Sequence, residues 1–251
     1  MSAQPEATDT AAGRRTPGRT PRRTSDGRRP AAAVRRRARE QEILAATRDL
    51  FDARGVRDAQ IEDIARAVGV NRAIIYRHFT GKEELFALTL VGYLDELEGA
   101  LTAADDADAG PRERLRRITE AFIDFGFEHP PFVDLAQTLM RRTGPELLEE
   151  ISEAAVYRLG SAISTCLGRV AEVLRAGVER GTFHTDDPDL LANTLYATGL
   201  GGMQLARVGM LVKEAAPGVP TVAALSPAQV KEHMVAASLA MAVGVTAPES
   251  P

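Results

Sequence analysis

The stretch 61-IEDIARAVGVNRAIIYRHF-79 has the pattern of two short helices joined by a tight turn. Ala65 is small enough to let the two helices cross closely. Gly69, four residues later, can adopt the positive φ angle that such a turn requires. Ile75 is expected to pack back against the isoleucines of the first helix. This spacing predicts a helix-turn-helix, with an ordinary αα-hairpin as the alternative.

The residues that follow extend this pattern and connect it to a known family. The chain carries an Ile-Ala pair, a Gly-Val pair, an Ile-Tyr-Arg-His-Phe run (75–79) and Lys-Glu-Glu-Leu (82–85). In this combination it resembles the TetR family of bacterial transcriptional repressors over about residues 37–90. A looser likeness continues in 177-GVERGTF-183 and 187-DPDLLANTLYATGLGG-202. The resemblance implies a DNA-binding domain followed by a larger ligand-binding and dimerisation domain.

The periodicity of apolar residues is helical almost throughout, and no stretch has the alternation of a sheet. We therefore predict an all-α fold with a three-helix helix-turn-helix domain and a larger C-terminal helical domain. The predicted domains are a disordered Arg-rich tail (1–36), the DNA-binding domain (37–82), the ligand-binding and dimerisation domain (83–246) and a disordered tail (247–251). The predicted helices span 37–54, 60–68, 71–79, 82–101, 112–128, 131–141, 146–180, 187–212 and 227–245, with a loop over 215–227.

Charge is distributed unevenly along the chain. The net charge of −4 combines +4 over residues 1–34, +4 over 35–82 and −12 over 83–251. A basic front half on an acidic body is expected when one end meets a polyanion such as DNA.

Cys166 is the single cysteine, which excludes an internal disulfide framework and a Cys-rich zinc site. No apolar run approaches a membrane span or a signal peptide, so we expect a soluble, cytoplasmic protein.

The recognition helix should present its N-terminal residues to base edges in the major groove. Arg72 is the best candidate for reading guanine, because its planar fork can bind O6 and N7 together. Ala73 permits close approach, Ile74 can contact a thymine methyl, and Arg77 lies one turn further along. The resemblance implies phosphate contacts from Tyr76, His78 and Lys82, the last at a helix N-terminus that favours anions. The full set of predicted DNA contacts is Gln60, Asn71, Arg72, Ala73, Ile74, Tyr76, Arg77, His78 and Lys82.

One feature departs from the family pattern. The family usually places Ser or Thr just before the second helix, whereas this chain has 58-DAQ-60. Asp58 can cap the helix but repels phosphate, and Gln60 is a weak substitute. The arginines of residues 1–37 are expected to add non-specific DNA affinity, with a solvated extension as the alternative.

The run 121-AFIDFGFEHPPF-132 contains four of the eight phenylalanines. Its aromatic residues are not confined to one stripe, so the helix is expected to be surrounded by others. A plain hydrophobic core is the alternative to a ligand site. The resemblance implies a pocket here for a mostly apolar small molecule with one or two polar groups. The candidate ligand-binding residues are Phe122, Phe125, Leu135, Leu139 and Met140.

Small residues in the last two helices suggest close helix packing. Glycines within 187–212 cost about 1 kcal/mol each relative to alanine, which suggests that a partner helix or a ligand approaches the backbone. Helix 227–245 is rich in alanine. The resemblance implies that these two helices form a four-helix homodimer interface, with an intramolecular bundle as the alternative. The candidate interface residues are Gly199, Gly202, Met234, Ala237 and Met241.

Enzymatic motifs are missing from the sequence: there is no His-Glu-x-x-His, no Gly-x-Ser-x-Gly, and no complete phosphate or dinucleotide loop. The cluster of His184, Asp186, Asp187 and Asp189 is interpreted as a helix cap rather than a metal site. We therefore expect no enzyme activity, no cofactor and no metal.

The sequence predicts a dimeric repressor that binds a palindromic operator and is released by an apolar effector. The alternatives are a DNA-binding regulator without a small-molecule ligand and an all-α enzyme that kept its DNA-binding domain.

Overall fold

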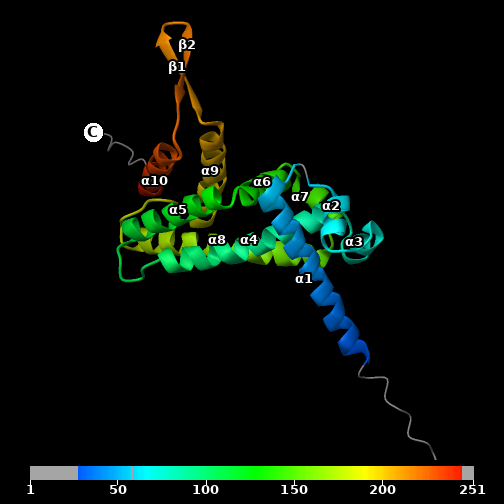
Figure 1. The fold of residues 1–251 in the computed structure, drawn as a ribbon. Helices are drawn as coiled ribbons and strands as arrows, with labels where there is room; N and C mark the ends of the chain where they lie inside the picture. Colours follow the sequence, from blue (N-terminus) through cyan, green and yellow to red (C-terminus); the bar gives the residue numbers. More distant parts are fainter. Residues whose placement is uncertain (1–27, 58, 245–251) are drawn as a thin grey trace, which may run out of the picture. The chain divides into compact units, whose positions relative to one another are not determined.

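The computed structural model describes residues 28–57 and 59–244. Helices dominate this part of the chain, so the all-α prediction is confirmed. The elements, labelled in Figure 1, are α1 (Arg28–Arg54), α2 (Ile61–Ala67), α3 (Arg72–His78), α4 (Lys82–Ala104), α5 (Pro111–Glu128), α6 (Pro130–Met140), α7 (Gly144–Glu150), α8 (Glu153–Glu179), α9 (Pro188–Val208), β1 (Met210–Ala216), β2 (Val219–Ala224) and α10 (Pro227–Val243).

The first three helices share a core of aliphatic and aromatic side chains. Phe51 of α1, Ile64 of α2 and Ile75 of α3 are each at most 1% exposed. Phe51 also meets Phe86 of α4 edge-on, with ring centroids 5.1 Å apart. The helix-turn-helix therefore packs directly on the first long helix of the larger domain.

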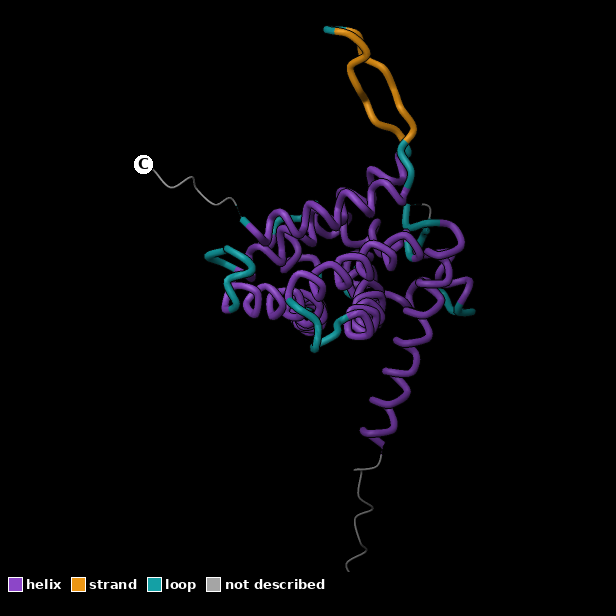
Figure 2. Tube along the Cα trace, turned by 90° about the vertical axis from the view of Figure 1, so that its left-hand side faces the viewer, coloured by secondary structure: helices purple, strands orange, loops and turns teal. Residues whose placement is uncertain are grey.

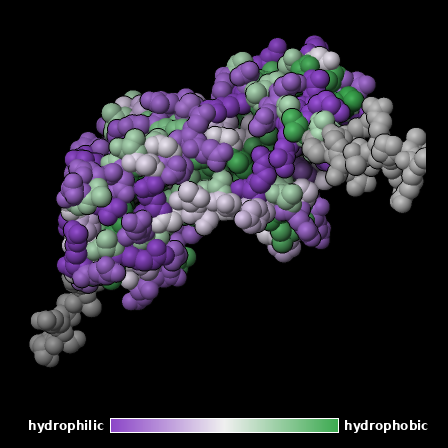
Figure 3. Space-filling model, turned by 90° about the horizontal axis from the view of Figure 1, so that it is seen from below, coloured by the Kyte–Doolittle hydropathy of each residue, from purple (hydrophilic) through white to green (hydrophobic). Residues whose placement is uncertain are grey.

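The larger domain is built around α4, which is buried along most of its length. This helix packs against α5, α6 and α8, while α9 and α10 pack against each other and against α5. Figure 1 shows α4, α5 and α8 side by side, and Figure 2 shows the bundle from another side. Hydrophilic side chains cover most of the face seen in Figure 3, because the apolar stripes of the helices turn inward.

The start of α1 differs from the prediction. The helix begins at Arg28 rather than at residue 37. Residues 31–33 are alanines and residues 35–37 are arginines, both strong helix formers, so a helix forms here without apolar periodicity. The remaining parts of the two predicted tails, residues 1–27 and 247–251, lie outside the described residues, as does Asp58.

The single helix predicted over 146–180 is in fact two helices. α7 ends at Glu150, and α8 begins at Glu153 after Ser152, whose side chain accepts a hydrogen bond from the Ala155 N–H at 3.3 Å. No glycine or proline marks this break. The sequence prediction overlooked Ser152 as the N-cap of a new helix, because the apolar pattern is helical on both sides of it.

The loop predicted over 215–227 and the end of the helix 187–212 are replaced by a β-hairpin. Gly209 ends α9 in the left-handed conformation, and β1 then pairs antiparallel with β2, with Val212 opposite Val222. The Pro-Gly pair at 217–218 forms the turn. A Pro-Gly pair between apolar runs indicates a hairpin, but the sequence prediction placed a helix and a loop here. The hairpin projects beyond α9 and α10 in Figures 1 and 2.

Candidate nucleic-acid interface and apolar cavity

The turn between α2 and α3 has the geometry that the sequence predicts. Gly69 has a φ angle of +70°, and the Val70 N–H donates to the Ala65 carbonyl at 2.9 Å. The Asn71 side chain accepts a hydrogen bond from the Ile74 N–H at 3.0 Å and so caps α3. These contacts place the first turn of α3 at an exposed corner of the helix-turn-helix.

The predicted DNA contacts gather on α3 and its two flanks. Ile75 turns inward to the core, so the other residues of the helix face outward or sideways. The exposed members of the set are Gln60, Asn71, Arg72, Ala73, Tyr76 and Arg77, and the half-buried members are Ile74, His78 and Lys82. All nine residues therefore lie at least partly at the surface.

The Arg72 guanidinium is held at both of its terminal nitrogens. Nη1 donates to Glu62 Oε1 at 2.6 Å, and Nη2 donates to the Tyr76 hydroxyl at 3.1 Å. The hydrogen bond with Tyr76 and the charge of Glu62 raise the pKa of Arg72. Glu62 is a residue that the sequence analysis did not single out. The two residues are ten positions apart on different helices, so their contact can be predicted only when the packing of α2 on α3 is known.

Two of the residues implied to contact phosphate lie where α3 gives way to α4. Lys82 is the first residue of α4, and its Nζ lies 4.8 Å from the centroid of the Phe86 ring. The half-buried His78 ring lies beside Phe79, with centroids 6.3 Å apart. The Lys82 ammonium group thus lies over the Phe86 ring in the first turn of α4, close to a helix N-terminus that favours anions.

A buried carboxylate joins this end of α4 to the start of α8. Glu84 is 5% exposed and accepts hydrogen bonds from the Thr80 N–H at 3.1 Å and the Thr80 hydroxyl. It also accepts from the Ser152 N–H at 3.3 Å and the Ser152 hydroxyl at 2.9 Å. Burial alone would raise the pKa of Glu84, but the donors from Thr80 and Ser152 outweigh it and lower the pKa. The loop after α3 is therefore tied to the larger domain.

Further polar contacts join α1 to the larger domain. Arg48 forms a bidentate ion pair with Glu96 of α4, and its Cζ lies 4.2 Å from the centroid of the Tyr93 ring. The Tyr93 hydroxyl donates to Asp52 at 2.7 Å. The helix-turn-helix is therefore tied to α4 through α1, and the loop after α3 is tied to the start of α8 through Glu84.

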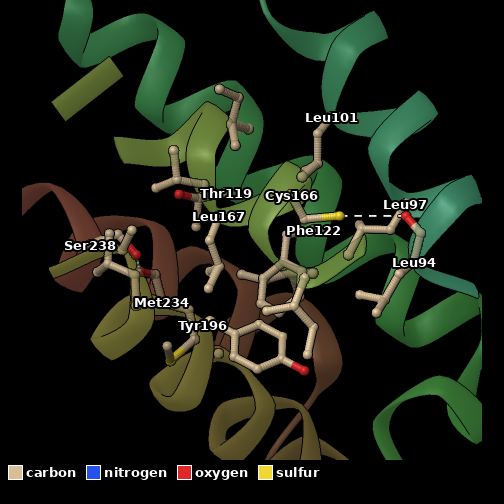
Figure 4. Close-up of a pocket in the computed structure, with 17 residues that line it drawn as sticks. Leu94, Leu97, Leu101, Thr119, Phe122, Cys166, Leu167, Tyr196, Met234 and Ser238 are labelled. Atoms are coloured by element: carbon tan, nitrogen blue, oxygen red, sulfur yellow. Dashed lines mark hydrogen bonds between the residues drawn. The ribbon is translucent and has the colours of Figure 1, made fainter. Parts of the chain in front are cut away.

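A small, partly open cavity lies in the larger domain, lined by residues of α4, α5, α8, α9 and α10. Its volume is about 50 Å³, and none of its lining side chains is charged. Figure 4 shows the aromatic rings of Phe122 and Tyr196 side by side at one wall, with centroids 5.8 Å apart. The lining residues are Leu94, Leu97, Leu101, Ile118, Thr119, Phe122, Ile123, Ile163, Cys166, Leu167, Val170, Ala192, Leu195, Tyr196, Gly199, Met234 and Ser238.

Four polar groups line this cavity, and two of them are already engaged. The Cys166 thiol donates to the Leu94 carbonyl at 3.4 Å, and the Ser238 hydroxyl donates to the Met234 carbonyl at 2.8 Å. The Tyr196 hydroxyl has no hydrogen-bond partner among the described residues. Burial raises the pKa of Tyr196, so its hydroxyl stays protonated at neutral pH and can donate. Sequence reasoning missed Tyr196, which periodicity alone places in an ordinary core.

Of the five predicted ligand residues, Phe122 alone lines this cavity. Phe125 and Leu135 are buried elsewhere in the core, Leu139 is buried on α6, and Met140 is 55% exposed. Phe125 instead contacts the rings of His129 and Phe132, and Phe132 also meets Phe122 edge-on. The cavity borders only the part of α5 that carries Ile118, Thr119, Phe122 and Ile123.

Three of the predicted dimer residues are used inside the chain. A Cβ atom at Gly199 would lie 2.5 Å from Cε1 of Phe122, and one at Gly202 would lie 2.7 Å from Sδ of Met234. Met234 is itself buried and lines the cavity. The close approach predicted at these glycines is therefore made by side chains of the same chain. Ala237 and Met241 are half-buried on α10.

Of the cluster at 184–189, Asp187 caps α9. The Asp187 side chain accepts from the Leu190 N–H at 2.9 Å, and Asp189 pairs with Arg175 at 2.6 Å. Within the described ranges, no group of three or more His, Cys, Asp or Glu side chains is arranged to hold a metal ion. In the same part of the chain, no helix combines the length and the hydropathy needed to cross a membrane.

Comparison with known proteins agrees with this geometry. The sequence model described as "Bacterial regulatory proteins, tetR family" matches residues 43–88, which contain α2, α3 and the start of α4. The helix-turn-helix region of the chain therefore belongs to the tetR family. The transcriptional activator FasR of Mycolicibacterium smegmatis is 33% identical over 108 residues, which cover 43% of this chain and 49% of FasR. The chain thus spans about half the length of that relative.

Other tetR-family proteins match over more of the chain. The transcriptional repressor KstR2 of Mycobacterium tuberculosis is 29% identical over 159 residues, which cover 61% of this chain and 74% of KstR2. The solved structure of this ketosteroid transcriptional regulator has a TM-score of 0.52 at 25% identity, covering 80% of this chain and 93% of that structure. RolR in complex with resorcinol has a TM-score of 0.61 at 19% identity, covering 86% and 93%, and shares the fold.

Proposed function

We propose that this chain is a transcriptional repressor that binds a palindromic operator as a homodimer and releases it when a mostly apolar small molecule binds. The observation that carries the proposal is the exposed first turn of α3, where Arg72 stands beside Ala73 on a helix capped by Asn71. Exposed residues at the start of a recognition helix contact base edges in the major groove. The names of FasR and KstR2, an activator and a repressor of transcription, support regulation as the role.

The proposed contacts divide into base reading and phosphate binding. Arg72 reads a guanine, Ala73 permits close approach, and Ile74 contacts a thymine methyl. Tyr76 and His78 bind phosphate from α3, and Lys82 does so from the N-terminus of α4. The remaining members of the set are Gln60, Asn71 and Arg77.

Replacing Arg72 by alanine should lower operator affinity by about 5- to 100-fold and relax the preference at one base pair of each half-site. Lys82→Ala should weaken binding to all sequences about equally, because a phosphate contact carries no base information. Selection of bound DNA from a random pool measures both effects. A selected motif that is unchanged by Arg72→Ala would contradict base reading by this residue.

The surface of α9 supports a homodimer. Small and apolar side chains recur on it at intervals of three or four residues, and all of them are exposed in the single chain. Such a stripe is expected to face another helix. This α9 stripe consists of Leu190, Thr194, Ala197, Gly201, Leu205 and Val208. With Ala237 and Met241 of α10 at its border, it is the proposed interface with a second copy.

The cavity supports a neutral, mostly apolar effector. Its lining has no charged side chain, so an ionised ligand would lose its hydration without gaining a counter-charge. The Tyr196 hydroxyl can donate one hydrogen bond to a carbonyl or hydroxyl oxygen of the ligand. Two similar proteins are described together with molecules of this kind: KstR2 is a ketosteroid transcriptional regulator, and RolR was solved in complex with resorcinol.

The size of the cavity explains how such an effector would act. About 50 Å³ is well below the roughly 300–1,000 Å³ of typical ligand sites, so the effector must displace side chains to enter. Phe122 and Met234 lie at the wall next to α9, where their movement changes the packing of α5, α9 and α10. Because the effector binds this rearranged state more tightly, it shifts the dimer to a spacing of the two α3 helices that does not fit successive major grooves.

Replacing Tyr196 by phenylalanine should weaken the effector by about two- to tenfold and leave operator binding unchanged, because it removes one hydrogen bond and little volume. Neutral apolar compounds, resorcinol and a ketosteroid among them, are first screened for a rise in melting temperature and for release of operator DNA. Tyr157→Phe is the matched control, since Tyr157 is 78% exposed on α8. Equal loss of effector affinity in both variants would rule out the Tyr196 contact.

A DNA-binding regulator without a small-molecule ligand is the second candidate, and the small volume of the cavity favours it. A metabolite extract separates the two candidates. Release of operator DNA by the extract supports the effector-controlled repressor, and unchanged binding supports the second candidate.

A further inference from the structure

The guanidinium of Arg72 is already oriented in the DNA-free chain. Its two terminal nitrogens are each held by one side chain, Glu62 of α2 and Tyr76 of α3. All three side chains are exposed, Arg72 and Glu62 by 59% and 51%. Two of the five N–H donors of the guanidinium are engaged, which leaves three available to a base.

The contact between Glu62 and Arg72 is specific to that acid. The neighbouring Asp63 points elsewhere: it pairs with Arg66 at 2.8 Å and lies 4.0 Å from Arg54. The two consecutive acids of α2 therefore have separate partners, and only Glu62 reaches the first residue of α3. The close crossing of α2 and α3 around Gly69 makes this reach possible.

Stability does not account for this ion pair. Exposed ion pairs contribute little to folding, because water screens the charges and the long side chains lose rotamer freedom. A carboxylate on a surface that meets DNA also repels phosphate. An arginine that binds a base must lose its own rotamer freedom, and an arginine that is already held loses less. Orientation of the guanidinium is therefore the effect that remains.

We propose that Glu62 is a specificity-determining positioning residue, which holds Arg72 in the orientation that reads its base. The inference rests on the proposed function, because it requires α3 to read an operator. Glu62 improves the discrimination between bases at one position of each half-site, and it lowers the affinity for DNA of any sequence. Tyr76 fixes the other terminal nitrogen of the same guanidinium.

The test compares Glu62→Ala with Asp63→Ala in the full chain. Both variants remove one negative charge from α2, so both should bind random DNA somewhat more tightly. Glu62→Ala alone should lower the preference for the base read by Arg72, by about two- to fivefold, the size expected for one exposed ion pair. The preference is the ratio of dissociation constants for the selected operator and for an operator altered at that base pair. Thermal melting shows whether each variant is folded.

A double-mutant cycle shows whether Glu62 acts through Arg72. In the Arg72→Ala background, Glu62→Ala should not change the base preference any further. An equal loss of preference with and without Arg72 would overturn the proposal and show that Glu62 contacts DNA itself. An equal change in the Glu62 and Asp63 variants, or a rise in preference in Glu62→Ala, would also overturn it. If the unaltered protein selects no DNA motif, the proposed function fails instead, so the two failures are distinguishable.

Discussion

Replacing Glu84 by alanine is expected to lower the free energy of unfolding by about 2–4 kcal/mol, because the Thr80 and Ser152 N–H groups lose a charged acceptor. Glu84 is 5% exposed, so water replaces this acceptor poorly. Urea unfolding at pH 7 measures the loss. Operator affinity should fall as well, because the loop after α3 is no longer tied to the start of α8.

Glu83→Ala is the matched control for this substitution. The Glu83 side chain is 34% exposed, and its one ion pair among the described residues is with Arg142, at 3.6 Å. Its removal should change the free energy of unfolding by less than about 1 kcal/mol. Losses of equal size in the two variants would show that the Glu84 hydrogen bonds do not stabilise the fold.

The stabilisation from Glu84 should also depend on pH. Its folded-state pKa is lowered, so the carboxylate stabilises the fold fully above the unfolded-state pKa of about 4.3. This stabilisation is lost as the pH falls through the lowered folded-state pKa. The difference in unfolding free energy between the native chain and Glu84→Gln should therefore be constant from pH 6 to 8 and shrink below about pH 4.

Placing an arginine at Gly201 is expected to abolish the homodimer. Gly201 is exposed in the α9 stripe, and a Cβ atom there would meet nothing within 4 Å in its own chain. The fold of the single chain should therefore tolerate the substitution. In the proposed interface the arginine would be buried without a counter-charge, at about 3–5 kcal/mol. The dissociation constant of the dimer should rise at least 100-fold, and operator affinity should fall with it.

Gly160→Arg is the control, because Gly160 is also an exposed helical glycine with nothing within 4 Å of an added Cβ atom, but on α8. Sedimentation at micromolar concentration should show a dimer for this variant and a monomer for Gly201→Arg. A Gly201→Arg protein that remains dimeric would exclude the α9 stripe as the interface.

The helix-turn-helix could be predicted from the sequence because its determinants are local. Ala65, Gly69 and Ile75 lie within eleven residues, and each has one evident physical role in the turn or the core. The cap at Asn71 is equally local. The Glu62–Arg72 pair was missed because it depends on how two helices cross, which spacing along one helix does not reveal.

The cavity could be predicted only in part. Phe122 and Phe125 both mark α5 as a helix with neighbours on several sides, but a void depends on how all the surrounding side chains fill space. Gly199 and Gly202 of α9 are sites of close approach, but side chains of the same chain, Phe122 and Met234, make that approach, and nothing lies within 4 Å of a Cβ atom at Gly201. The hairpin was missed because helical periodicity on both sides outweighed a single Pro-Gly turn.

Cys166 makes the interior of the larger domain accessible to chemical labelling. It is the one thiol among 251 residues, it lines the cavity, and burial raises its pKa to about 12. Alkylating reagents attack the thiolate, so the closed native chain reacts slowly. The rate of modification therefore reports how often the helices around the cavity separate, without any engineered label. A molecule that occupies the cavity shields the same sulfur, so a single mass measurement over time follows both opening and occupancy.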